Sequence, residues 1–169
     1  MDITRLILDD HAEQRRLFAI IEQIGSRDKD ALRSVWARLR ALLDTHARAE
    51  ELFFYPELLK IGKGADGESP KDETKDAIKD HNEIRDTAAK VDEEEVGSEQ
   101  WFKAVAAANK ANSDHMAEEE RQGLTDFRRH ADLQLRHRLA VEFARFEADH
   151  LTGVKPVDLN VDDYVLENS

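Results

Sequence analysis

Two histidine–glutamate pairs have a spacing that lets both side chains of each pair face the same point. His46 is followed four residues later by Glu50, and His115 is followed four residues later by Glu119. In an α-helix, residues four apart lie on one face, about 6 Å apart along the axis. An imidazole and a carboxylate placed in this way can bind one metal ion, or the carboxylate can bridge to a second ion. Imidazole suits iron, zinc and copper, and a bridging carboxylate suits a paired site.

Each pair is preceded along the chain by a lone histidine, and the whole arrangement is duplicated. Residues 10–15 (DHAEQR) recur as residues 80–85 (DHNEIR), so His11 corresponds to His81. One His-x-x-x-Glu pair on a helix surface is common, whereas the duplicated pattern favours a metal site. Each half of the chain is predicted to form an αα-hairpin, and two hairpins make a bundle.

Hydrophobic periodicity predicts the helices that must carry these residues. Apolar residues recur at three- and four-residue spacing, and short stretches rich in glycine and polar residues interrupt the pattern. Gly25 suits a left-handed helix end, and Ser69-Pro70 suits a helix start. Pro56 removes one backbone hydrogen bond and predicts a kink in the second helix. The expected helices span residues 3–24, 28–61, 69–91, 98–127 and 131–150.

The predicted fold class is therefore all-α, an up-down-up-down four-helix bundle with an additional C-terminal helix. Counted from the bundle ends at about 1.5 Å per residue, the four histidines fall within about a turn and a half of one another. We expect residues 1–128 to form the bundle, residues 129–152 to form an extra helix packed on it, and residues 153–169 to form an irregular acidic tail.

This pattern resembles the hemerythrin-like family, also called the HHE cation-binding domain. The family has a histidine on the first helix, His-x-x-x-Glu on the second, a histidine on the third, and His-x-x-x-Glu or Asp on the fourth. The resemblance covers about residues 5–125. It implies two non-haem iron ions bridged by two carboxylates and an oxo, hydroxo or water oxygen. The implied metal ligands are His11, His46, Glu50, His81, His115 and Glu119.

The sequence departs from the oxygen-carrying members at one position. These have a fifth histidine four residues from the histidine of the third helix. Here the positions four away from His81 are Ala77 and Arg85, and neither can serve as that ligand. We therefore expect a more open or more solvated site than that of an oxygen carrier.

Two further residues are alternative ligands. Tyr55 lies five residues after Glu50, about 140° away from that face of a regular helix. This favours a core position, although a distortion at Pro56 could bring the phenol to the metal ions. Glu118, three residues after His115, could replace Glu119.

Other polar residues are expected to have lesser roles. Arg15 and Arg85 follow the lone histidines by four residues and are expected to face solvent or form salt bridges, or else to support Glu50 or Glu119. Three histidines and one ferritin-like Glu-x-x-His spacing lie outside the duplicated pattern, and we expect no metal role for them. They are His130, His137 and His150, with Glu147 completing the spacing.

Composition excludes several classes of function. The chain has 25 lysines and arginines against 37 acidic residues, a net charge of −12, which disfavours binding to nucleic acid or to anionic membranes. It has no cysteine, which excludes disulfides, thiolate metal sites and a cysteine nucleophile. No apolar signal segment or run of 18 apolar residues occurs, so we expect a cytoplasmic protein. We expect it to be a monomer or a weak homodimer.

The expected function is redox chemistry of a small oxygen species at two iron ions. Peroxide removal of the catalase type, or reaction with dioxygen or nitric oxide, fits an open site. Two alternatives remain: an iron- or oxygen-responsive binding module without turnover, and a structural zinc bundle.

Overall fold

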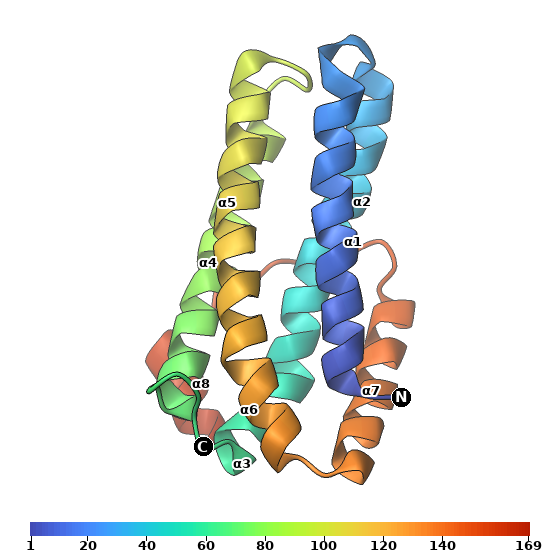
Figure 1. The fold of residues 1–169 in the computed structure, drawn as a ribbon. Coiled ribbons are helices and arrows are strands. Elements are labelled where there is room, and N and C mark those ends of the chain that lie inside the picture. The colour runs from blue at the N-terminus through green and yellow to red at the C-terminus, as the bar shows by residue number, and fades with distance from the viewer.

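Four long helices lie side by side in a computed structural model that describes residues 1–169 (Figure 1). The helices α1 and α2 form one hairpin, and α4 and α5 form the second; α1 also contacts α5, and α2 contacts α4, which closes the bundle. No strand is present, so the predicted all-α bundle is confirmed. The long helices are α1 (Ile3–Ile24), α2 (Lys29–Ala49), α4 (Pro70–Glu93) and α5 (Glu99–Arg121).

Side-chain caps fix where these helices begin. The hydroxyl of Ser69 accepts a hydrogen bond from the backbone of Asp72, and Ser98 accepts one from Trp101. These contacts satisfy backbone N–H groups that have no partner within the first helical turn. At the end of α1, Gly25 has a φ of 66°, as its glycine identity predicts, and a short 3-10 turn (η1, Gly25–Arg27) follows.

The second helix is interrupted where the sequence predicts a kink. Residues Glu50–Phe54 form a π-helical turn (η2), and α3 (Tyr55–Ile61) continues with Pro56 in its first turn. The backbone N–H of Tyr55 donates to the carbonyl of Glu50, which is five residues earlier. The turn therefore holds one residue more than an α-helical turn, and the side chains that follow are rotated relative to a regular helix.

The fourth helix is shorter than predicted. It ends at Arg121, and after Gln122, which has a ψ of −85°, a separate helix α6 (Gly123–His130) begins. A glycine is a poor helix former, and Gly123 is buried close to Leu58 and Phe54 of the second helix. The expectation of one continuous helix over residues 98–127 is therefore wrong at this point.

Two helices follow the bundle. The expected extra helix, α7 (Leu133–Asp149), packs on α1, α2 and the π-helical turn. The expectation of an irregular tail is wrong for α8 (Val161–Asn168). This helix is capped by Asn160, it buries Tyr164 and Val165, and the Tyr164 hydroxyl donates to the carbonyl of Glu51 at 2.6 Å. Tertiary burial thus stabilises a helix that is too short to be stable alone.

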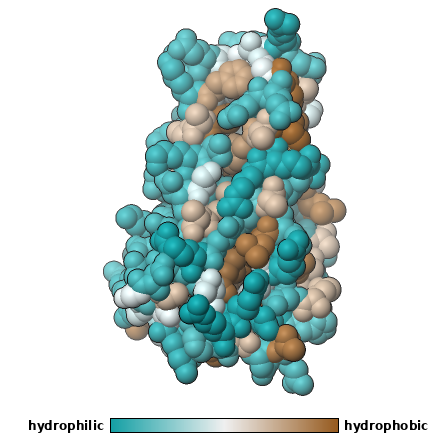
Figure 2. Space-filling view, viewed as in Figure 1, coloured by the Kyte–Doolittle hydropathy of each residue, from teal (hydrophilic) through white to brown (hydrophobic).

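Two apolar clusters fill the bundle, one on each side of a buried polar layer. One cluster lies toward the hairpin turns and includes Trp36, Leu39 and Trp101; the other lies toward the chain termini and includes Ile7, Phe54 and Phe127. The face seen in Figure 2 is mostly hydrophilic, with separate hydrophobic patches. None of the helices has the length and apolar composition needed for a membrane span.

Candidate metal centre

The six residues that the family resemblance implies as ligands meet between the two apolar clusters. They come from all four long helices, and Glu50 stands at the first position of the π-helical turn. None of them has more than 5% of its surface exposed. The structure therefore brings together, away from solvent, His11, His46, Glu50, His81, His115 and Glu119.

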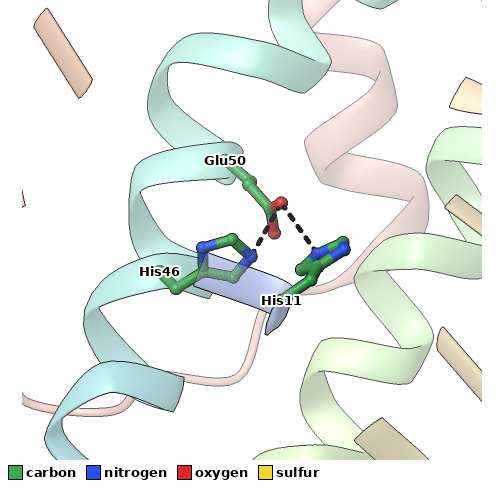
Figure 3. Close-up of side chains that lie close together, drawn as sticks. All are labelled: His11, His46 and Glu50. Atoms are coloured by element: carbon green, nitrogen blue, oxygen red, sulfur yellow. Dashed lines mark ion pairs between the residues drawn. The ribbon is translucent and has the colours of Figure 1, made fainter. Parts of the chain in front are cut away.

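One group of donor atoms gathers around Glu50 on the side of the first hairpin (Figure 3). The Nε2 atom of His46 lies 3.0 Å from Oε1 of Glu50, and Nε2 of His11 lies 4.0 Å from the same oxygen. His11 also approaches Oε2 of Glu119, at 3.4 Å. These three residues, His11, His46 and Glu50, can offer one ligand atom each to a common ion.

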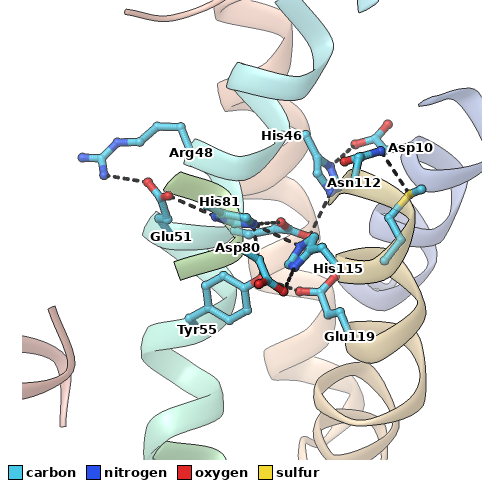
Figure 4. Close-up of polar contacts among 12 residues, drawn as sticks. Asp10, His46, Arg48, Glu51, Tyr55, Asp80, His81, Asn112, His115 and Glu119 are labelled. Carbon is cyan, nitrogen blue, oxygen red and sulfur yellow. Dashed lines mark hydrogen bonds and ion pairs between the residues drawn. The ribbon is translucent and has the colours of Figure 1, made fainter. Parts of the chain in front are cut away.

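A second group uses the other oxygen of the same glutamate. The Nε2 atom of His81 lies 3.3 Å from Oε2 of Glu50 and 3.2 Å from Nε2 of His115 (Figure 4). Glu50, His81 and His115 again offer ligand atoms close enough to share an ion. Glu50 therefore belongs to both groups, one oxygen facing each.

Each of the four histidines is held by a carboxylate at its outer nitrogen. The Nδ1–oxygen distances are 2.9 Å for His11 and Glu120, 3.0 Å for His46 and Asp10, 3.0 Å for His81 and Glu51, and 3.5 Å for His115 and Asp80. Such a partner fixes ring orientation and leaves Nε2 free to act as the ligand atom.

The two glutamate supports cross between the hairpins in a symmetric way, whereas Asp10 and Asp80 each face a histidine of their own hairpin. Glu51 of the first hairpin holds His81 of the second, and Glu120 of the second holds His11 of the first. The supporting glutamates directly follow the two glutamates of the duplicated pattern, and the supporting aspartates directly precede its lone histidines. None of the four was expected from the sequence, although the repeated Asp-His and Glu-Glu steps are a usable signal.

Each glutamate that holds a lone histidine also accepts a hydrogen bond from an arginine. Arg85 donates to Oε1 of Glu51, and Arg15 donates to Oε1 of Glu120 at 2.8 Å. The expected salt bridges are confirmed, but the arginines pair with Glu51 and Glu120 and not with Glu50 and Glu119.

The donor set fits a metal ion. The buried atoms His11 Nε2, His46 Nε2, both carboxylate oxygens of Glu50, and Glu119 Oε2 have no hydrogen-bond partner. Buried polar atoms are almost always paired, so this group of unpaired atoms facing one another is suited to a bound cation. Neighbouring ligands of one ion stand about 3 Å apart because metal–ligand bonds are about 2.1 Å long, and several distances above match this.

The electrostatics of the centre also favour a cation. Burial alone would lower the pKa of His46, but the charge of Glu50 and the hydrogen bond to Asp10 raise it well above the ordinary histidine value. Burial also opposes charge on His81, yet the neighbouring carboxylates of Glu50 and Glu51 raise its pKa to about 9. The carboxylates therefore attract positive charge strongly, and metal ions would supply it in place of protons.

The π-helical turn brings Tyr55 to the centre. Its hydroxyl donates to Oε1 of Glu119 at 2.6 Å and lies 3.5 Å from Nε2 of His81. Burial and the charges of Glu119 and Glu50 raise the pKa of Tyr55 well above 10. The angle of about 140° between Tyr55 and the face of Glu50 holds only for a regular α-helix. It is wrong here because the π-helical turn between the two residues rotates Tyr55 toward the centre.

A narrow cavity of about 20 Å³ reaches the centre between α4 and α5. Ala77, Tyr55, His115 and Glu119 line its inner part. Ala77 is one of the two positions, four residues from His81, considered above for a fifth histidine, and its small side chain leaves space there. Glu118 lines the cavity with an exposed side chain, whereas Glu119 is buried among the histidines.

The remaining histidines lie apart from the centre. His137 faces the N-terminal amine, and His130 and His150 contact backbone carbonyls of their own helices. Glu147 is closer than expected: it can share an ion with Asp10 and His46, with ligand atoms within 4.8 Å of one another. Burial and the neighbouring Asp10 raise the pKa of Glu147 to about 8.

Comparison with known proteins gives one match. The model of the hemerythrin HHE cation binding domain matches residues 2–125. No curated protein and no solved structure matches the chain.

Proposed function

The chain belongs to the hemerythrin HHE cation-binding family, and from that premise we propose that it holds two iron ions and reacts with small oxygen species, foremost hydrogen peroxide. The observation that supports a pair of ions is the position of Glu50 between two groups of histidines. The proposed ligands are the six residues His11, His46, Glu50, His81, His115 and Glu119.

Iron is the metal that best suits this donor set. Imidazole and carboxylate ligands without thiolates suit iron, and so does a carboxylate that spans two ions. Two iron ions supply two redox equivalents, which is the number that conversion of hydrogen peroxide to water or to dioxygen requires. Structural zinc sites are closed by four protein ligands, whereas here a cavity is lined by two of the proposed ligands.

Peroxide chemistry is favoured by the cavity beside Ala77. A small neutral molecule can reach His115 and Glu119 there without displacing a protein ligand. In disproportionation, one peroxide is oxidised to dioxygen and releases two protons and two electrons, and a second takes them up to give two waters. Tyr55 keeps its proton, donates a hydrogen bond to Glu119 and lines the cavity, so its hydroxyl can orient a peroxide molecule that enters.

Metal analysis and peroxide assays test this proposal together. We expect two iron ions per chain, a near-ultraviolet absorption of the oxidised protein, and gas evolution on addition of peroxide. One iron per chain, or zinc alone in an iron-replete preparation, would contradict the paired centre. A two-iron protein that leaves peroxide untouched would instead support a sensing role.

A further inference from the structure

The cavity that reaches the metal centre is lined by several carboxylates and by no basic side chain other than His115. Its carboxylates come from α4 and α5, and no lysine or arginine lines it. Four other hollows on the surface each include at least one arginine or lysine. We call the four carboxylates outside the metal centre the acidic passage; they are Glu73, Asp76, Asp80 and Glu118.

The acidic passage is continuous with a wider groove on the outside of the bundle. This groove, of about 280 Å³, runs between α4 and α5 and shares Asp80 and Glu118 with the cavity. Glu83 and Asp114 line it further out, and its one basic residue, Lys110, is paired with Asp114. The groove therefore adds carboxylates at the Asp80 and Glu118 end of the cavity, whereas Glu73 lies at its other end, about two helical turns earlier on α4.

Glu73 gives the passage a feature that surface acids lack. Only 6% of its surface is exposed, and its Oε2 atom has no hydrogen-bond partner. The other oxygen, Oε1, accepts a hydrogen bond from the backbone of Ala65 and so keeps the side chain in place. A buried, oriented carboxylate oxygen without a partner on a cavity wall is suited to a cation.

At its inner end the passage joins the centre itself. Glu119 lines the cavity, and its Oε2 atom is also without a hydrogen-bond partner. Asp80 lines both the cavity and the groove, and its carboxylate lies 3.5 Å from Nδ1 of His115 (Figure 4). A cation that leaves Glu73 can thus be taken up by carboxylate and imidazole donors within the same cavity.

We infer that the acidic passage is the route by which ferrous iron reaches the centre, with Glu73 as a transient ligand on the way. This inference rests on the diiron centre proposed above. Hard divalent cations prefer carboxylate oxygens, and an acidic cleft with low-dielectric walls raises the local concentration of cations. The passage involves no redox step, since the ion moves as Fe²⁺.

The test is the rate at which metal-free protein takes up iron. Anaerobic Fe²⁺ is added, uptake is stopped at set times with a chelator, and iron bound to the desalted protein is counted. The variant Glu73→Gln/Asp76→Asn/Glu118→Gln replaces three carboxyl groups of the passage and spares Asp80, whose carboxylate lies 3.5 Å from Nδ1 of His115. We expect uptake at least tenfold slower than in the wild type, with the same final iron content.

A matched control removes three charges elsewhere. Asp86→Asn/Glu93→Gln/Glu94→Gln alters exposed acids of α4 and its end that do not line the cavity. We expect it to load within twofold of the wild type. Added salt should slow iron uptake by the wild type and the control but have little effect on uptake by the passage variant. Salt screens the attraction between Fe²⁺ and the carboxylates of the passage, and the variant lacks three of these.

The outcomes separate the two proposals. Equal loading rates in the passage variant and the control would overturn the passage as the iron route. A wild-type protein that fails to bind two iron ions after long incubation would overturn the diiron centre itself. Co²⁺ loading, followed by its visible absorption, gives a second readout that does not depend on peroxide turnover.

Discussion

The Nδ1 atom of His81 lies 3.0 Å from Oε1 of Glu51, so the residue that follows a proposed ligand in one hairpin holds a histidine of the other. Glu51 is 2% exposed and also accepts a hydrogen bond from Arg85, whereas the equivalent Glu120 is partly exposed. The two supports are therefore related by the duplication but differ in burial.

Loss of the buried support should weaken metal binding. We expect Glu51→Gln to lower iron affinity by about 10- to 100-fold, because the ring of His81 loses its negatively charged partner. Glu120→Gln should have a smaller effect, since water can replace its carboxylate. Competition with a chelator measures both, and Glu93→Gln serves as the control; equal affinities in all three would argue against this role.

Loss of a proposed ligand should remove iron and destabilise the bundle. His46→Ala and Glu119→Ala leave buried carboxylates and imidazoles without their metal, at a cost on the order of several kcal/mol. Iron analysis and thermal unfolding measure the effect. His137→Ala and His150→Ala, away from the centre, should keep two iron ions per chain, and iron loss in these instead would refute the ligand assignment.

Filling the space beside the centre should slow peroxide turnover without removing iron. Ala77→Val adds two carbons to the cavity wall. We expect retained iron and at least tenfold slower peroxide consumption. Ala89→Val, at an exposed position of the same helix, controls for the lower helix propensity of valine. Unchanged turnover in Ala77→Val would show that substrate reaches the centre another way.

The metal-free protein should become less stable as pH rises from about 4.5 to about 7, in part because of Glu73. Burial first, and then the nearby charges of Asp126 and Glu68, raise the pKa of Glu73 to about 7 from an ordinary 4.5. The folded state thus binds a proton more tightly than the unfolded state, so stability falls between about pH 4.5 and pH 7. Glu73→Gln should raise the Tm by a few degrees at pH 8 and leave it unchanged at pH 4. A lower Tm at pH 8 would contradict the raised pKa.

The same Tm measurement on the triple passage variant is a control for the iron-uptake test. A variant that is more stable yet loads iron more slowly cannot owe its slow loading to a damaged fold.

The helices and the six central residues were predictable because both depend on local periodicity. Apolar spacing fixes which face of each helix is buried, and the duplicated histidines and glutamates lie on those faces. Asp10, Glu51, Asp80 and Glu120 were harder to assign. They are neighbours of the central residues along the chain, and whether a neighbouring position points inward depends on how the hairpins pack.

Two other features required the tertiary structure. A π-helical turn has no sequence signature beyond the nearby Pro56, yet it decides that Tyr55 reaches Glu119. The helix α8 was missed because eight residues carry little periodicity, although Asn160 followed by Asp162 and Asp163 is typical of a helix start.

The crossed supports also bear on how such a chain could have arisen. Neither hairpin can support its own lone histidine, because Glu51 and Glu120 each serve the opposite hairpin. Two copies of one ancestral hairpin, related by a twofold axis, would complete the same set of contacts. Fusion of the two copies into one polypeptide then allows the halves to diverge. Tyr55 corresponds to Leu124 in the duplicated frame, so the two halves differ here: one has a phenol beside the cavity and the other an apolar side chain.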